Sequence, residues 1–269
     1  MRKIAVLIAI GGVALGTGLV VWLGAGKIWR ALIAVGWGGF AVMIAWQFLI
    51  FLVLVTAWYV IYPGGRWLVL VWGRLVRDGA TKILPFSGVG GLVFGARAIA
   101  IEGVSSTASI VSSLADLAAE SLGEILFLLL GIVLLLAHRP KGAMFVPAVI
   151  GAALVVLGGG VLIWTERHSA RLFQMISERV AQRWVMRGKK QSVEVEREFN
   201  RIFTSARRIG CAAGLHLVGW TSGGVALWIC YRFLGATVGL LPCMAIEALL
   251  SAALSVALLV PIGPGVQEV

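Results

Sequence analysis

Charge is scarce in this sequence: charged residues make up 13% of the 269 positions, and only 12 residues are Asp or Glu. Soluble globular proteins average about 25% charged residues. Hydrophobic residues account for 60% of the chain, and the mean hydropathy is +0.98. These values exclude an ordinary soluble domain and predict a polytopic membrane protein.

Cysteine is also rare, and the motifs of several common enzymes are missing. The three cysteines have no C-x-x-C spacing, which argues against a disulfide framework or a metal site. The sequence contains no G-x-x-x-x-G-K-[ST], H-E-x-x-H or G-x-S-x-G motif, so it gives no support to nucleotide hydrolysis, metalloprotease or serine hydrolase chemistry. We therefore expect no catalytic residue set, no metal and no cofactor. If transport is active, protons on acidic residues are the available energy source.

Apolar runs long enough to cross a bilayer are frequent. About 20 consecutive apolar residues span the hydrocarbon core as a helix, and the two longest runs must tilt or extend beyond it. The predicted fold is an all-α transmembrane bundle, a single domain over residues 1–269, with about six spanning helices and one or two re-entrant segments. The six runs comprise residues 4–24, 31–62, 105–137, 146–164, 209–231 and 242–260.

The distribution of basic residues predicts the topology. Residues 166–208 hold eleven Lys or Arg and five acidic residues, and the positive-inside rule places such a segment in the cytoplasm. If residues 83–104 enter the membrane and return on the same side, seventeen basic residues lie inside and five outside, whereas a full crossing gives thirteen and nine. We therefore expect residues 83–104 to be re-entrant, with the N-terminus and residues 63–82 in the cytoplasm.

The basic segment also has an amphipathic pattern. Within it, residues 167–187 combine basic and apolar side chains at helical spacing, which favours a helix lying on an anionic leaflet. The net charge of +11 is therefore a topology signal, and no nucleic acid partner is expected.

The predicted re-entrant segment contains a proline and several glycines. Pro85 lacks the N–H that an unbroken helix uses, and Gly88, Gly90, Gly91 and Gly95 permit a tight reversal. Non-helical backbone at membrane depth persists only where protein covers it or water bathes it. The break therefore predicts a polar cavity.

The helix expected after this break carries a polar stripe. At 100° per residue its serines and acids fall within about one third of the circumference, and a carboxylate at the centre of a membrane helix costs about 2.5–3.5 kcal/mol. We expect the stripe to face a cavity. The alternative is that residues 105–121 lie at the cytoplasmic interface, where the acids pair with Arg97, Arg74 or Arg77. The stripe consists of Ser105, Ser109, Ser112, Ser113, Asp116, Glu120 and Glu124.

A weaker copy of this arrangement occurs near the end of the chain. Glu247, Ser251 and Ser255 recur at helical spacing before the segment VPIGPGVQEV. Paired interruptions in two halves of a membrane protein are typical of a binding site at a repeat interface, although the prolines alone could simply end a helix. The residues of this second break are Pro261, Gly263, Pro264 and Gly265, followed by Gln267 and Glu268.

Histidine occurs inside one expected span, at His216. A proton carrier is one interpretation. We favour the other, in which this lone histidine is hydrogen-bonded between helices.

Three stretches resemble a known family. RDGATKILPFSGVGGLVFGARA, the Asp116/Glu120 helix and VPIGPGVQE are similar to the lysylphosphatidylglycerol synthase transmembrane-region family, also called flippase-like integral membrane proteins. LPFSGVGG…GARA resembles its hopanoid-biosynthesis-associated HpnL branch. The resemblance implies a multi-pass protein of the bacterial inner membrane that binds or moves a lipid, since relatives move aminoacylated phosphatidylglycerol between leaflets. It further implies that Arg97, Asp116, Glu120 and residues 261–268 lie near the lipid path, with hopanoid-biosynthesis proteins as partners.

The sequence departs from the family pattern at two places. Ile262 stands where the family's terminal motif has glycine, and family members continue through further membrane helices beyond the position of Val269. We therefore expect a product truncated at its C-terminus.

The resulting functional prediction is a lipid flippase-like protein with a polar groove. Such a groove lowers the cost of moving a polar headgroup through hydrocarbon, with Arg97 attracting the headgroup and the acidic stripe hydrogen-bonding it. Alternatives are a membrane-embedded enzyme or accessory of hopanoid or lipid biosynthesis, in which the acids act as general acid or base, and a structural scaffold. The stripe covers about 28 Å, which favours a path over a compact catalytic centre. The predicted lipid-path residues are Arg97, Glu102, Asp116, Glu120, Glu124, Glu247, Gln267 and Glu268.

Overall fold

The computed structural model describes residues 2–83, 87–137, 153, 197–199, 201–203 and 205–257. Every regular element in these residues is a helix, which confirms the all-α prediction for the described part of the chain. The helices are α1 (Arg2–Ile61), α2 (Trp67–Ile83), α3 (Ser87–Ile101), α4 (Ser106–Ala137), α7 (Ala206–Phe233) and α8 (Leu240–Ala257).

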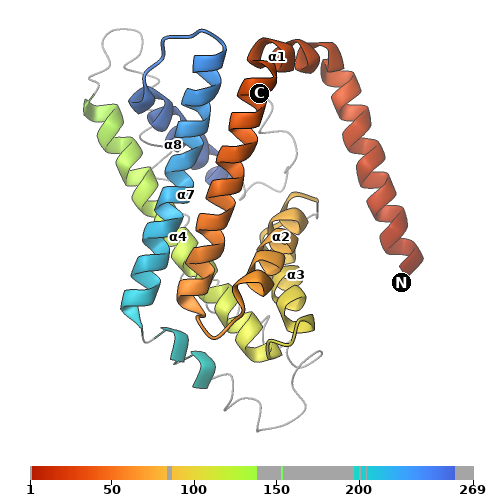
Figure 1. Cartoon of the computed structure of the whole chain (residues 1–269), viewed down its shortest axis with the longest axis vertical. Coiled ribbons are helices and arrows are strands. Elements are labelled where there is room, and N and C mark those ends of the chain that lie inside the picture. The colour runs from red at the N-terminus through yellow and green to blue at the C-terminus, as the bar shows by residue number, and fades with distance from the viewer. Residues whose placement is uncertain are drawn as a thin grey trace.

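The helices form a bundle with a hairpin at its side (Figure 1). The second half of α1 lies beside α7, α4 crosses behind them, and α8 packs at the opposite end of the bundle from the start of α4. The first half of α1 extends away from the bundle as a separate arm, and α1 changes direction at the top of the view. Within α1, Gly36 has a φ of 73°, a left-handed backbone conformation that glycine adopts without a steric penalty.

Within the described residues, three helical stretches are long and apolar enough to cross a membrane: Ile33–Ile61, Ser106–Leu135 and Ala206–Phe233. They coincide with the predicted spans at 31–62, 105–137 and 209–231. Among the other predicted spans, residues 4–24 are helical within α1, and residues 242–257 are helical within α8, whose apolar part is shorter. Apart from residue 153, the span at 146–164 lies outside the described residues, so the count of about six stays a prediction.

Small residues let α1, α4 and α7 approach closely. The core cluster between them includes Ala57 of α1, Ala115 and Ala119 of α4, and Ala212 of α7. At Gly123 the contact is closer still, since an added Cβ would lie 2.8 Å from the Cβ of His216. Helices that lack a hydrophobic driving force in lipid associate through such close contacts.

Helices α2 and α3 form an antiparallel hairpin that returns to the end of the bundle where it began (Figure 1). A cluster of Val55, Trp58, Val69, Leu70 and Ile99 packs this hairpin against α1. Its two limbs approach each other at glycines. A Cβ at Gly95 would lie 2.7 Å from the Cβ of Arg77 and 3.2 Å from the carbonyl oxygen of Gly73, and a Cβ at Gly91 would collide with Thr81.

The hairpin corrects the expected position of the reversal. Gly88, Gly90 and Gly91 lie within α3, and the chain changes direction between the end of α2 and the start of α3. These glycines are therefore helical, and the absence of a side chain at Gly91 and Gly95 serves close packing of α3 on α2. Residues 67–83, which overlap the segment 63–82 expected in the cytoplasm, form the first limb of the hairpin, and the side of the membrane on which they lie stays a prediction. Pro85 lies outside the described residues.

Candidate functional site

Helix α2 has charged side chains on its buried face and apolar side chains on its exposed face. A surface helix of a soluble protein has the opposite arrangement. Arg74 and Arg77 are buried, with 2% and 7% of their surface exposed, whereas Leu68, Trp72 and Leu75 are exposed. The exposed residues follow each other at intervals of four and three, so they form one face of the helix. An apolar outer face and a charged inner face are typical of a helix that contacts lipid.

The two buried arginines pair with two acids of α4. Arg74 Nη1 donates to Asp116 Oδ2 at 3.0 Å, and Arg74 Nη2 lies 3.6 Å from Glu120 Oε1. Arg77 donates to the same Asp116 oxygen through Nη1 and to Glu120 Oε2 through Nη2. Asp78, one helical turn after Arg74, accepts a hydrogen bond from Arg74 Nε at 3.1 Å. The two arginines thus hold the hairpin against α4.

The second oxygen of Asp116 connects the cluster to α7. Asp116 Oδ1 lies 3.0 Å from His216 Nε2, and both residues are almost fully buried. One turn further along α7, Trp220 Nε1 donates to the carbonyl oxygen of Glu120 at 3.3 Å. His216 is therefore hydrogen-bonded between helices, as expected. Asp116 joins three helices, α2, α4 and α7, through one carboxylate. We call Arg74, Arg77, Asp116, Glu120 and His216 the buried ionic cluster.

Three of the four serines of the polar stripe face the protein interior, and Ser105 is exposed. Ser109, Ser112 and Ser113 are fully buried. Their hydroxyls donate to carbonyl oxygens one turn earlier in the chain: Ser109 to Ser105, which directly precedes α4, at 2.9 Å, and Ser113 to Ser109 at 2.7 Å. Because these hydroxyls are satisfied within the helix, the serines act in this structure as small residues at a helix interface.

The buried ionic cluster is closed on one side and partly open on the other. The side chain of Asp116 has no exposed surface, but 24% of the Glu120 side chain and 41% of the Asp78 side chain are exposed. A ligand would therefore meet Glu120 and Asp78 before it reached the arginines.

The other predicted residues are placed as follows in the part of the chain that the structure describes. Arg97 is exposed on α3, and Glu102 follows the end of α3 and lines a separate groove. Glu124 is half-buried on α4. Glu247 is half-buried on α8 and packs over Gly223 of α7, where a Cβ would lie 2.6 Å from Glu247 Oε1. Outside the described residues are Pro261, Gly263, Pro264, Gly265, Gln267 and Glu268.

Arg74 and Arg77 were not among the predicted lipid-path residues. They entered the argument as cytoplasmic charges and as partners in the alternative interface model, and the structure pairs them with the acids as that alternative expected. The pattern WLVLVWGRLVRDGA contained the signal, because its two arginines stand three residues apart among apolar positions. Within the described residues, no group of three His, Cys, Asp or Glu is arranged to hold a metal ion.

Comparison with known proteins identifies the family. The family model described as lysylphosphatidylglycerol synthase TM region matches residues 8–269. No curated protein and no solved structure matches the chain. The family match and the apolar helices together indicate a membrane protein related to lipids. Because the match covers nearly the whole sequence, the chain belongs to the lysylphosphatidylglycerol synthase transmembrane-region family.

Proposed function

We propose that this chain binds a lipid headgroup and translocates it between the leaflets of the bacterial inner membrane. The observation that carries the proposal is the buried ionic cluster, which lies inside a bundle whose hairpin has an apolar outer face. The family's description names a lipid-modifying synthase, which supports a lipid as the ligand. The lipid is a phospholipid or a hopanoid, and the protein is multi-pass with a cytoplasmic N-terminus.

The position of the cluster along its helices supports translocation. Asp116 follows the first residue of α4 by ten positions, which is about 15 Å along the helix. The hydrocarbon core is about 30 Å thick. If α4 begins at the membrane surface, its paired charges lie near the middle of the bilayer, where an unpaired charge is most costly.

Exchange of ion-pair partners provides a mechanism. A phosphate arriving beside Glu120 competes with the carboxylates for the guanidinium groups of Arg74 and Arg77, because guanidinium binds phosphate and carboxylate with the same fork of donors. The released carboxylates then accept hydrogen bonds from amines or hydroxyls of the headgroup. Each charge keeps a partner throughout, so the headgroup crosses without leaving an unpaired charge buried.

The enzyme alternative requires substrate contact with an acid or a base. A general acid or base must lie within hydrogen-bond reach of the atom that it protonates or deprotonates. Asp116 and His216 are 0% and 1% exposed and pair with each other. In this arrangement a substrate would reach Glu120 first, since 24% of its side chain is exposed.

A leaflet-resolved assay tests the proposal. The purified chain is reconstituted into liposomes that contain phosphatidylglycerol, lysylphosphatidylglycerol, phosphatidylethanolamine or a hopanoid with a polar headgroup. Headgroup amines are labelled with a membrane-impermeant reagent, and other lipids are followed by an enzyme added to one side. We expect at least one of these lipids to redistribute faster than in protein-free liposomes. Equal rates for all of them would contradict translocation.

A further inference from the structure

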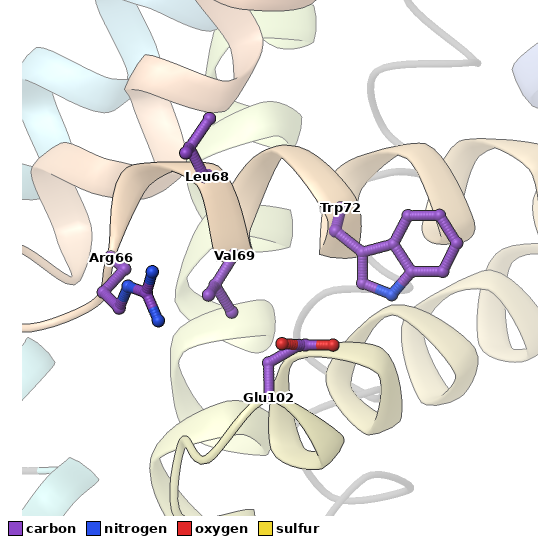
Figure 2. A pocket seen from close by; sticks show the side chains of 5 residues that line it. All are labelled: Arg66, Leu68, Val69, Trp72 and Glu102. Atoms are coloured by element: carbon purple, nitrogen blue, oxygen red, sulfur yellow. The ribbon is translucent and has the colours of Figure 1, made fainter.

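A second polar site lies at the end of the hairpin where α2 begins and α3 ends. A groove of about 230 Å³ is lined by Arg66, Leu68, Val69, Trp72 and Glu102. In Figure 2 the guanidinium of Arg66 lies at one side of this groove, the indole of Trp72 lies at the other, and the carboxylate of Glu102 lies between and below them. One cation, one anion and one aromatic ring therefore line the same small space.

The two charges of this groove are available to a ligand. Among the described residues, neither Arg66 nor Glu102 forms an ion pair, although both line the same groove. Arg74 and Arg77, only a few residues further along α2, are fully engaged with acids. A groove that presents separate positive and negative groups attracts a molecule that carries both charges.

We propose that this groove binds the zwitterionic headgroup of a phospholipid that carries a primary ammonium group, with its phosphate on Arg66 and its ammonium on Glu102. The partial charges of the helix ends have the same signs as these side chains, because Arg66 precedes the N-terminus of α2 and Glu102 follows the C-terminus of α3. A volume of about 230 Å³ is smaller than a typical pocket for a drug-sized ligand, so it suits a headgroup with its acyl chains outside.

The walls of the groove favour a lipid over a soluble phosphate ester. Leu68 and Trp72 line the groove and are also exposed on the apolar face of α2, where acyl chains would continue from the headgroup. Tryptophan favours this position because its ring is apolar and its N–H is a donor. This end of the bundle also carries Arg201, whose Nη2 would lie 3.8 Å from a Cβ at Gly64. A basic end of this kind contacts the cytoplasmic leaflet.

The groove is distinct from the buried ionic cluster, and its proposed role goes beyond translocation. It rests on the proposed function only in taking a lipid as the ligand. Equilibrium binding of a lipid measures occupancy of the groove without any translocation. A failed translocation assay and a failed binding assay are therefore distinguishable. Arg77→Gln, which changes the cluster, should slow lipid redistribution and leave headgroup preference at the groove unchanged.

Native mass spectrometry of the detergent-solubilised chain tests the site. The protein is titrated with phosphatidylethanolamine and, separately, with phosphatidylglycerol of the same acyl chains. We expect the wild type to bind phosphatidylethanolamine about threefold to fivefold more tightly, the upper part of the range of an exposed charge pair. Glu102→Gln should remove this preference, and Arg66→Gln should weaken binding of both lipids. Arg208→Gln, which removes an exposed arginine at the start of α7, is the charge-matched control and should change neither.

Three results would overturn the site. The first is equal binding of the two lipids by the wild type, and the second is an unchanged preference in Glu102→Gln. The third is displacement of the lipid by millimolar glycerophosphoethanolamine, which has the same headgroup without acyl chains and is expected not to compete. Displacement at that concentration would assign the groove to a soluble ligand and overturn the lipid assignment.

Discussion

Arg77 and Asp116 occupy equivalent positions on two different helices. Arg77 follows the first residue of α2 by ten positions, and Asp116 follows the first residue of α4 by ten. Both helices start at the same end of the bundle (Figure 1), and the guanidinium of Arg77 donates to Asp116 Oδ2. The hairpin is thus fixed to α4 by paired buried charges.

Breaking this pair should destabilise the protein. Loss of one partner of a buried ion pair costs about 3–5 kcal/mol because the other charge stays buried. We expect Arg77→Gln and Asp116→Asn each to lower the unfolding temperature in detergent, measured by fluorescence-detected size-exclusion chromatography. The double variant should lose less than the sum of the two. Arg97→Gln, which removes an exposed arginine, should shift the temperature far less, and equal shifts for Arg97 and Arg77 would contradict the cluster.

Close packing of the hairpin predicts opposite effects at two glycines. Gly95→Ala places a Cβ 2.7 Å from the Cβ of Arg77, and overpacking of this kind costs about 1–3 kcal/mol. Gly79→Ala on α2 has no atom within 4 Å of the new Cβ and should stabilise α2 by up to about 1 kcal/mol. Unfolding temperatures of the two variants measure the difference. A stabilising Gly95→Ala would show that the two limbs do not pack closely.

The hydrogen bond of His216 predicts which replacements the site accepts. His216→Leu removes the donor to Asp116 Oδ1, which leaves part of a buried carboxylate unsatisfied at a cost of about 1–3 kcal/mol. His216→Gln retains an N–H donor at a similar reach and should retain most of the stability. The two variants are compared by thermal unfolding. Equal losses would indicate that packing of the ring, rather than its hydrogen bond, is the contribution of His216.

Periodicity and apolar length predicted the long helices because those signals are local. The run at 105–137 is helical over Ser106–Ala137, and the polar stripe that it carries faces the interior at Asp116. The partners of Asp116 were beyond local signals, since Arg77 and His216 come from helices 39 and 100 positions away in sequence. The placement of residues 63–82 in the cytoplasm rested on charge alone and stays a prediction, whereas the burial and pairing of Arg74 and Arg77 became visible only in the structure.

The hairpin predicts that both of its ends emerge on one side of the membrane. In a background without Cys211, Cys230 and Cys243, we expect Gly64→Cys and Ser106→Cys to react with a membrane-impermeant maleimide only from the cytoplasmic side. Leu234→Cys, exposed after α7 at the opposite end of the bundle, should react only from the periplasmic side. Labelling of Gly64→Cys and Ser106→Cys from opposite sides would exclude the hairpin topology.

The rate of lipid redistribution in proteoliposomes tests the central claim most directly. The wild type, Arg77→Gln, Asp116→Asn and the control Arg208→Gln are reconstituted in equal amounts, and insertion is verified for each. If the buried ionic cluster exchanges partners with the headgroup, both cluster variants should lose at least tenfold in initial rate, which corresponds to about 1.4 kcal/mol, while the control retains the wild-type rate. Cluster variants that insert normally and redistribute lipid at the wild-type rate would show that these charges hold the bundle together and take no part in a lipid path.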